Sequence, residues 1–546
     1  MALISILLLE RMKITSFRDA LSILSKSSPY SVKTLSTRAP DEFDALKRWL
    51  YVEQDIEKDL RAQLERSLPG DVVFLCGSSG DGKSEILTRV YDQYQHRIAF
   101  HLDATHSFSP SQSAIDALDQ TFRSERGANR VLVVGINIGM IGNYALEGHE
   151  DNRGVREAMR NFLDGHSQDG RFFFFNFENY PKFKIENGVA VAPFAKKIMQ
   201  RLTKASADNP FYAVFTRDYT DHGEQLLYAN FRLLTLEGVQ DTVIANIAKA
   251  RLAKDQFVTA RGLLDLLHHV LTGPGYLFDN LFAGGDNELA DRIAAFDPAL
   301  RRTRELDQLV LRYELGLPEP ERDAFLAELT TWNIRFDKEY PSAASLIRLL
   351  CILQREPVGN NYHHEFAEEF ADQEMVEYAE VWKMHAQFDG GNEARTALQR
   401  LYRRVLSAGI FRYANRNAPE LRTDEILLGE FHGVKVAGLA DLKPDYAELQ
   451  RGAVKGSIAH FNVALKVGDE SLKPMPFNIN LFALLVRLNK GYRPNKYDKN
   501  AVVLLDELVE QIKALVKRDN RLKLYRQPQP ISLRYEDGMI DTVGEL

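Results

Sequence analysis

The chain has 546 residues, a formal net charge of −7 and two cysteines. This length exceeds what one hydrophobic core usually serves, so about three or four folding units are expected. Two cysteines are too few for a disulfide framework or a cysteine zinc site, which suits a reducing cytoplasm. The negative net charge excludes a chain that coats nucleic acid indiscriminately, but it leaves room for a local basic face.

An apolar run at residues 2–9 is the one segment that could be taken for a targeting signal. No basic region precedes it, and Glu10 and Arg11 follow it, so a secretory signal is not expected and Met12 is an alternative start. No other stretch reaches the ~18 apolar residues of a membrane span. We therefore expect a cytoplasmic protein without a membrane partner.

Residues 1–70 are expected to form a helical lead-in. The pattern over residues 17–27 predicts one helix, and residues 41–68 predict a long amphipathic helix with Leu46, Leu50, Leu60 and Leu64 near helical spacing. Pro69 and Gly70 are expected to end that helix.

The strongest motif lies at residues 71–90, DVVFLCGSSGDGKSEILTRV. Its first apolar residues predict a buried strand, the next eight match G-x-x-x-x-G-K-[ST] without a mismatch, and an amphipathic helix is expected to follow. The residues expected to hold a nucleotide are Gly77, Ser78, Ser79, Gly80, Asp81, Gly82, Lys83, Ser84 and Glu85.

The residue types of this motif fit a bound triphosphate. Glycines let backbone N–H groups approach phosphate oxygens, and the start of a helix directs its positive end toward them. Lys83 is expected to reach the β- and γ-phosphates, and Ser84 to supply a hydroxyl to Mg²⁺. The sequence therefore predicts that ATP and Mg²⁺ bind here.

Strands alternate with helices over residues 71–235, the expected nucleotide-binding domain. After the strand at 72–76, further strands are expected at 97–102, 130–136, 171–177 and 212–215, which indicates an α/β fold with a parallel, doubly wound sheet. Ligands of such sheets lie outside the carboxyl ends of the strands. Those ends carry Asp103, Asn137, Asn176 with Glu178, and Arg217.

The subclass expected from this pattern is the P-loop NTPase of the additional-strand, AAA+-like kind. In that class the third strand carries the Walker B acid, which holds Mg²⁺, and the fourth carries a polar sensor residue. Counting strands puts Asn137 in the Walker B position and Asn176 in the sensor position. An amide, however, lacks the negative charge of a usual metal ligand or base. Three explanations stay open: Asp103 serves as the acid and binds Mg²⁺ together with Ser84, Glu178 reaches the γ-phosphate, or ATP is bound and hydrolysed poorly. Each acid also has a structural interpretation, as a turn cap or a solvated loop residue.

Residues 236–300 are expected to form a helical lid. Thr259 is expected to open one of its helices, and AAA+ proteins place an arginine at the start of a lid helix to sense the γ-phosphate. Arg261 is the candidate for that role, and an ordinary surface arginine is the alternative.

Residues 301–455 are expected to form a helical domain with two charged segments. Residues 363–382 are strongly acidic, which a solvated helix face explains. Residues 395–416 carry six arginines and no acid, interleaved with Tyr402, Phe411 and Tyr413. Nucleic-acid contact and pairing with the acidic helix explain this basic segment equally well.

Residues 456–546 are expected to form a small α+β module with a basic side. Strands are expected at 458–467 and 522–535, and helices at 478–489 and 501–516. Tyr492 and Tyr497 in the loop between the helices suit stacking on bases, so the module is expected to contact DNA or an acidic protein. The basic residues expected to make this contact are Lys490, Arg493, Lys496, Lys499, Lys517, Arg518 and Arg521.

Five segments together carry a resemblance to a known family: FLCGSSGDGKSEILTR, FHLDATHSFSPSQSAIDALDQ, VVGINIGMIGN, FFFFNFENYPKF and NKGYRPNKYDKN. From about Phe17 to the C-terminus the chain resembles the F subunit of the Dnd/Dpt phosphorothioation-dependent DNA restriction system. The resemblance implies a bacterial anti-phage component that works with G and H subunits to restrict DNA lacking the phosphorothioate modification. The motif residues 77–84 carry over directly, whereas Asp103, Asn137 and Asn176 lie in matching segments without a role that follows from the match.

The sequence carries no convincing nuclease signature, so a nuclease site is expected on a partner. The expected function is an ATP-binding and ATP-hydrolysing subunit of a DNA restriction complex, with double-stranded DNA and further copies of the chain as candidate partners. The alternatives are a non-catalytic scaffold that uses nucleotide to set its shape, and a regulatory AAA+ or STAND-like switch outside restriction.

Overall fold

The structure is a computed structural model that describes residues 14–28, 42–104, 112–128, 130–180, 182–186, 189–220, 224–254, 257–336, 342–451, 460–518, 521–526, 529–536 and 539–543. Its contacts divide the chain into two compact units. Unit 1 comprises Met1–Lys184 and Val191–Ala371, and unit 2 comprises Ile185–Ala190 and Asp372–Leu546. The apolar run at residues 2–9 lies outside the described residues.

Unit 1 contains a five-stranded sheet with the order β2-β3-β1-β5-β4. The strands β2, β3, β1 and β5 are parallel, and the short β4 pairs antiparallel with β5. The four parallel strands confirm the strands expected at 72–76, 97–102, 130–136 and 171–177. The strand bounds are β1 (Val72–Cys76), β2 (Ile98–His101), β3 (Val131–Ile136), β4 (Gln168–Asp169) and β5 (Phe172–Asn176).

The strand order departs from the expected additional-strand class. That class has one more strand between the P-loop strand and the strand that carries the acid, whereas β1 pairs directly with β3 through the register Val72↔Leu132 to Cys76↔Ile136. The other edge of β1 pairs with β5 through the register Val72↔Phe172 to Cys76↔Asn176. Both edges of β1 are therefore used, and the end of β3 lies directly beside the end of β1.

The fifth strand expected at residues 212–215 is wrong, because these residues lie inside helix α10 (Pro210–Thr220). The proline suits the first position of a helix, and the buried Phe211 and Val214 lie three residues apart on one face. Arg217 is thus a helical residue rather than a strand end, and its Nη2 donates to the Ile14 carbonyl.

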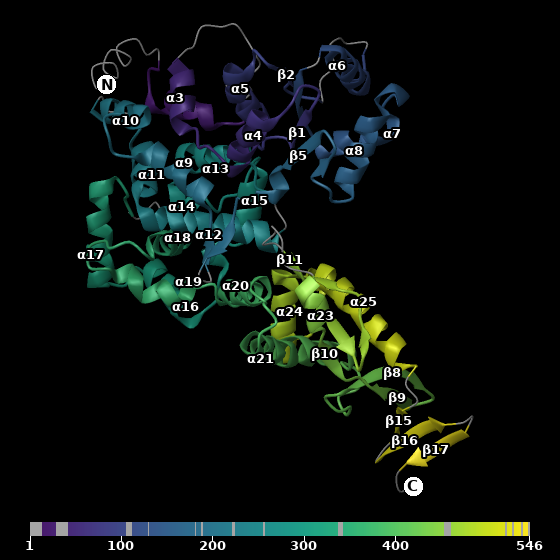
Figure 1. Ribbon diagram of the computed structural model, residues 1–546. Helices are drawn as coiled ribbons and strands as arrows, with labels where there is room; N and C mark the ends of the chain where they lie inside the picture. Colours follow the sequence, from purple (N-terminus) through teal and green to yellow (C-terminus); the bar gives the residue numbers. More distant parts are fainter. Residues whose placement is uncertain are drawn as a thin grey trace. The chain divides into compact units, whose positions relative to one another are not determined.

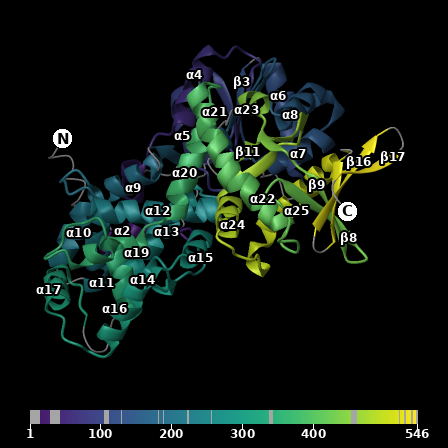
Figure 2. The same ribbon diagram turned by 90° about the horizontal axis from the view of Figure 1, so that it is seen from below.

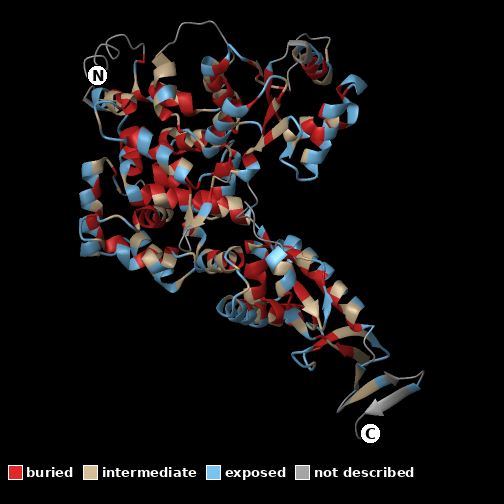
Figure 3. Ribbon diagram, viewed as in Figure 1, coloured by how far each residue is buried: buried red, intermediate tan, exposed pale blue. Residues whose placement is uncertain are grey.

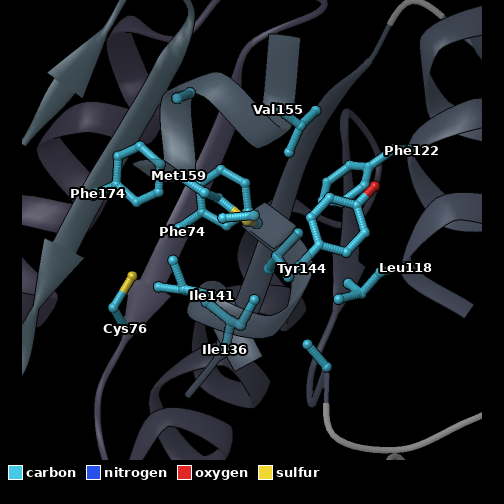
Figure 4. Close-up of a cluster of buried hydrophobic side chains, with 14 of the residues drawn as sticks. Phe74, Cys76, Leu118, Phe122, Ile136, Ile141, Tyr144, Val155, Met159 and Phe174 are labelled. Atoms are coloured by element: carbon cyan, nitrogen blue, oxygen red, sulfur yellow. The ribbon is translucent and has the colours of Figure 1, made fainter. Parts of the chain in front are cut away.

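Helices cover both faces of the sheet, with α4 and α5 on one side and α6, α7 and α8 on the other (Figure 1). On the α6–α8 side, Phe74 of β1 stacks on Phe174 of β5 with a ring-centroid distance of 4.7 Å, and Phe122 and Tyr144 pack beside them (Figure 4). The opposite side buries Leu60, Leu64, Ile86, Leu87 and Val90 against the strands. Burial on both faces explains why the strands are continuous apolar runs.

The long helix expected over residues 41–68 is two helices, α3 (Glu42–Leu50) and α4 (Asp55–Arg66). Gln54 is extended at the start of α4. The carbonyls of Trp49 and Tyr51 accept hydrogen bonds from Arg201 Nη1, which provides partners for backbone groups released where α3 ends. Helical spacing continues across this break, so the sequence pattern did not reveal it.

The remaining elements of unit 1 are mostly helical, and buried residues run through α11, α12, α13, α14 and α18 (Figure 3). The helix expected to open at Thr259 is confirmed as α13, and Thr259 Oγ1 accepts the Gly262 N–H at 2.9 Å. These elements are α2 (Phe17–Leu21), α5 (Lys83–Tyr94), α6 (Ala114–Ala128), α7 (Ile138–Glu147), α8 (Arg153–Leu163), α9 (Pro193–Thr203), α11 (Gln225–Thr235), α12 (Glu237–Ala253), α13 (Ala260–Thr272), α14 (Leu277–Asn280), α15 (Glu288–Ala294), α16 (Arg304–Glu314), α17 (Pro320–Leu329), α18 (Ala343–Leu353), α19 (Ala367–Phe370), and the 3₁₀ turns η1 (Ser22–Leu24), η2 (Glu150–Asn152), η3 (Phe177–Asn179), η4 (Pro298–Leu300), η5 (Thr330–Trp332) and η6 (Tyr362–Phe366).

The unit boundary at residues 371 and 372 falls inside the segment 301–455 that was expected to form one helical domain. Helix α20 (Gln373–Ala386) instead joins the C-terminal elements, because its Tyr378 and His385 pack on Phe461, at ring-centroid distances of 6.1 and 4.2 Å. The helices expected at 478–489 and 501–516 and the strands expected within 522–535 are confirmed, whereas the strand expected at 458–467 is two strands, β11 (His460–Val463) and β12 (Leu465–Val467), in different sheets.

Unit 2 combines helices with three small sheets, ordered β10-β12-β13, β11-β14 and β17-β16-β15-β9-β8. A two-stranded pair of β6 (Lys184–Glu186) and β7 (Val189–Val191) lies at the point where the chain passes between the units in sequence. The other elements are α21 (Asn392–Leu401), η7 (Tyr402–Ser407), α22 (Ala408–Ala414), β8 (Glu425–Phe431), β9 (Val434–Leu439), β10 (Leu442–Pro444), α23 (Tyr446–Arg451), β11 (His460–Val463), β12 (Leu465–Val467), β13 (Glu470–Ser471), β14 (Met475–Asn478), α24 (Ile479–Asn489), η8 (Lys496–Asp498), α25 (Lys499–Val516), β15 (Arg521–Arg526), β16 (Gln529–Glu536) and β17 (Met539–Val543). No helix among the described residues is both long enough and apolar enough to cross a membrane.

Candidate nucleotide site

The glycine-rich loop, residues 77–84, joins β1 to α5, as the motif predicts. Gly80 and Gly82 have φ angles of 83° and 101°, in the left-handed region that favours glycine, and α5 begins directly after Gly82. A side chain at Gly77 would come within 2.9 Å of the Asp81 carboxylate and 2.8 Å of the Phe177 ring. The loop therefore makes a tight turn at the carboxyl end of β1, and helix α5 begins at the end of this turn.

Lys83 lies across this loop. Its Nζ donates to the carbonyls of Gly77 at 3.0 Å and Ser78 at 2.8 Å, and its side chain is buried. Burial lowers the pKa of Lys83 below 10.5, and the charges of Asp81 and Asp103 partly oppose that shift. The ammonium thus lies within the loop, in a setting where a nearby anion would stabilise it.

Asp81 forms an ion pair that the motif gave no reason to expect. Its carboxylate is fully buried, accepts the Ser78 N–H at 2.8 Å, and lies 2.7 Å from Lys182 Nζ. Lys182 comes from the segment after β5, and its ammonium also lies 5.4 Å from the centroid of the Phe177 ring. A residue about one hundred positions downstream therefore balances the buried charge of the loop. We call this contact the Asp81–Lys182 pair.

Asp103 follows β2, and its charge raises the pKa of Lys83 against the larger lowering effect of burial. The Ala104 N–H donates to the Gly135 carbonyl at 2.9 Å, and a side chain at Gly135 would come within 2.4 Å of the Leu102 carbonyl oxygen. The backbone after β2 therefore lies against β3 at a position where only glycine fits. Since β1, β2 and β3 are parallel, Asp103 follows its strand at the same edge of the sheet as the glycine-rich loop.

The two candidate asparagines flank the loop on opposite sides. Asn137 follows Ile136, whose carbonyl accepts the Gly77 N–H at 3.2 Å, and it precedes α7 without capping that helix through its side chain. Asn176 pairs in register with Cys76, and its Oδ1 accepts the Glu178 N–H at 3.1 Å. Glu178 itself is exposed. The structure thus brings Asn137 and Asn176 to the start of the loop.

The other motif residues divide between the loop surface and helix α5. Ser78 and Ser79 are exposed, and Ser84 is partly buried in the first turn of α5. The Glu85 carboxylate pairs with Arg89 of the same helix at 2.9 Å, and the Arg89 guanidinium lies 3.4 Å from the Tyr51 ring centroid. Glu85 therefore has a structural partner within α5.

The predicted metal ligands are Ser84, in the first turn of α5, and Asp103, which follows β2. Among the described residues, no group of three or more His, Cys, Asp or Glu side chains could hold a metal ion. A Mg²⁺ bound here would take few protein ligands, which is usual when a triphosphate supplies several of its oxygens.

Helix α13 contacts the loop through its first turn. The Arg261 N–H donates to the Gly80 carbonyl at 3.1 Å, and a side chain at Gly80 would come within 3.3 Å of Thr259 Oγ1. The Arg261 guanidinium donates through Nη2 to the Lys26 carbonyl at 2.6 Å. Helix α13 therefore begins beside the loop, and the contact it makes with the loop is through the Arg261 backbone.

The sequence did not identify Lys182 or Gly135 as residues that shape the site, because neither belongs to a recognisable motif. Lys182 had no local pattern to single it out. The glycine at 135 interrupts the apolar strand VLVVGI, and a glycine inside a strand is a signal of close backbone approach that could have been used.

Comparison of the chain with protein-family models, with curated proteins and with solved structures found no match.

Proposed function

We propose that the chain binds ATP with Mg²⁺ at the glycine-rich loop and hydrolyses it, with Lys83 on the β- and γ-phosphates and Ser84 on the metal. The domain would be a P-loop nucleotide-binding domain in which β1 and β3 are neighbours, rather than one of the additional-strand class. Support comes from the left-handed glycines, the helix that starts at Lys83, and the exposure of Ser78 and Ser79 at the loop surface.

The observation that supports hydrolysis is the contact of the backbone at Leu102 and Ala104 with Gly135 of β3, the strand beside β1. Of the three explanations for an amide in the Walker B position, it favours Asp103 as the acid, because Asp103 lies in this contact segment and its charge raises the pKa of Lys83, whereas Glu178 is exposed and Asn137 is neutral. In this proposal Asp103 binds or orients the hydrated Mg²⁺ beside the phosphates.

The wider role we propose follows the family resemblance: an ATP-dependent subunit of a bacterial restriction complex acting on DNA that lacks phosphorothioate, with G and H subunits as partners. A non-catalytic, nucleotide-dependent scaffold is the rival, and the neutral Asn137 and Asn176 beside the loop favour it. A measurement of ATP turnover distinguishes the ATP-hydrolysing subunit from the scaffold.

The test is steady-state ATP hydrolysis by the purified full chain, with and without double-stranded DNA. Asp103→Asn should retain ATP binding and lose turnover by about 10²-fold or more, as expected for loss of a catalytic carboxylate. Glu178→Gln is the matched control and should leave turnover within a few-fold. Transfer of the defect to Glu178→Gln would reject the Asp103 assignment, and a wild-type chain that binds ATP without measurable turnover would favour the scaffold.

A further inference from the structure

Two basic segments that lie about eighty residues apart in the sequence meet at Asn489, the last residue of α24. The Asn489 Nδ2 donates to the carbonyls of Arg404 at 3.2 Å and Val405 at 3.1 Å, and Arg412 Nη1 donates to the Asn489 carbonyl at 2.8 Å. Helices α22 and α24 accordingly lie side by side (Figure 2).

This junction coincides with a local departure from α-helical geometry. The segment η7 between α21 and α22 is a π-helix, and Asn489 binds two successive carbonyls within it. Such π-helical turns occur frequently at functional sites. Through these contacts and that of Arg412, η7 and α22 meet the C-terminal end of α24.

Five exposed basic residues belong to the two segments that meet at Asn489, and we call them the basic surface: Arg403, Arg404, Arg412, Lys490 and Arg493. In the described part of the chain, none of these five has a carboxylate within ion-pair distance. The explanation that the arginines of 395–416 pair with the acidic segment 363–382 is therefore not supported by any ion pair between the described side chains.

The loop after α24 is held in one shape by a buried acid. Asp498 accepts hydrogen bonds from Tyr492 Oη at 2.8 Å and from the Asn495 N–H at 2.9 Å, and it lies 3.3 Å from Arg487 Nη2. The Asp498 carboxylate has its hydrogen-bond partners inside the loop and its ion-pair partner in α24, so its charge is already balanced there. A loop that is ordered before binding loses less entropy when a ligand binds.

The basic residues expected to cluster in the C-terminal module in fact fall into two groups. Helix α25 separates Lys499 from Lys517, and its 18 residues span about 27 Å at 1.5 Å per residue. At the far end, Arg518 lies 3.7 Å from Glu470. Lys517, Arg518 and Arg521 therefore do not belong to the basic surface, and Arg403, Arg404 and Arg412 take their place.

We infer that the basic surface binds the phosphate backbone of double-stranded DNA. A protein partner is less well suited, because protein interfaces bury an apolar centre ringed by polar residues. Within residues 392–416 and 487–499, which are all described, Tyr497 is the one large apolar side chain that is strongly exposed, at 84%. Guanidinium and ammonium groups without carboxylate partners match phosphate oxygens instead, and such contacts carry little base preference.

The test is binding of a short, labelled double-stranded DNA to the full chain over a range of salt concentrations, without nucleotide. The triple variant Arg404→Gln, Lys490→Gln and Arg493→Gln removes three charges from the basic surface. The matched control, Lys517→Gln, Arg518→Gln and Arg521→Gln, removes three at the other end of α25. Arg412 is left intact because it holds Asn489.

The basic-surface variant should lower DNA affinity and flatten the slope of log affinity against log salt by about 2 to 3, since each phosphate contact contributes about 0.9. The control should keep the wild-type slope. Equal losses in both variants, or an unchanged slope in the first, would overturn the inference. Loss of co-purification with a partner subunit at unchanged DNA affinity would overturn it too and assign the surface to an acidic protein.

The inference deepens the proposed restriction function by naming where DNA binds, and its test is independent of the nucleotide site. DNA binding is measured without ATP. A chain that fails to bind ATP but shows the expected salt slopes would therefore refute only the nucleotide proposal.

Discussion

Replacing Lys182 by methionine should open the glycine-rich loop, because the buried Asp81 carboxylate then loses its ion-pair partner. Asp81 is fully buried, and the Lys182 side chain is 11% exposed. Breaking such a buried pair from one side costs about 3–5 kcal/mol. We expect the lower end, about 3 kcal/mol, because Asp81 keeps the hydrogen bond from the Ser78 N–H. Methionine preserves the length and the apolar stem of the side chain, so the change isolates the charge.

The double variant Asp81→Asn, Lys182→Met should restore the loop. The amide oxygen of asparagine can still accept the Ser78 N–H, and the pair leaves no uncompensated carboxylate, while Lys83 keeps its two carbonyl contacts. Asp81→Asn alone should cost less than Lys182→Met alone, because the partly exposed lysine can extend its ammonium toward water whereas the buried carboxylate cannot.

The assay is amide hydrogen exchange of peptides that cover residues 72–84, since global unfolding of a chain with two units is not a two-state process. A cost of about 3 kcal/mol corresponds to about 150-fold faster exchange through local opening. The double variant should return to within about fivefold of the wild type. Lys184→Met, at an exposed lysine two residues on, is the matched control and should change nothing. Equal exchange in Lys182→Met and the double variant would mean that the two charges are not coupled, and the reasoning would then be refuted.

Two further predictions concern Asp103. Gly135→Ala should displace the backbone after β2, because the new Cβ would lie 2.4 Å from the Leu102 carbonyl oxygen. We expect about 1–3 kcal/mol of destabilisation and a larger loss of ATP turnover than of ATP affinity. The control Gly139→Ala, whose Cβ would meet nothing within 4 Å, should be neutral or slightly stabilising. Similar turnover in the two alanine variants would contradict the role given to Gly135. ATP affinity should fall with rising pH below 10.5, since burial lowers the pKa of Lys83 in the free loop and a bound triphosphate would favour the charged form. Removing the charge in Asp103→Asn should shift that fall to lower pH, and isothermal titration at several pH values would reveal an unshifted profile if Asp103 does not act on Lys83.

The parallel strands and the glycine-rich loop were predictable because local patterns determine them. Val72–Cys76 is a continuous apolar run, and the glycines of the motif have φ angles that few other residues adopt. The same reasoning failed at residues 212–215, where a short aromatic run fits a strand and a buried helix equally well. There the proline at 210 was the better guide, since it suits the first turn of a helix.

Long-range pairings were beyond the sequence because they depend on strand order. Counting strands along the chain could not show that β3 lies directly beside β1, or that Lys182 reaches Asp81 across the loop. Charge clusters depend on the same long-range contacts: Lys499 and Lys517 lie at opposite ends of helix α25, whereas the Arg404 carbonyl accepts a hydrogen bond from Asn489, the residue before Lys490.

The measurement that tests the central claim most directly is equilibrium binding of ATP with Mg²⁺ to the purified full chain, compared with Lys83→Ala. Lys83 contributes its charge to the loop through two carbonyl contacts and little to any apolar core, so the variant should fold normally by circular dichroism. The account predicts that the wild type binds ATP and that Lys83→Ala loses at least about tenfold in affinity, which corresponds to about 1.4 kcal/mol. A folded Lys83→Ala chain that binds ATP as tightly as the wild type would contradict it.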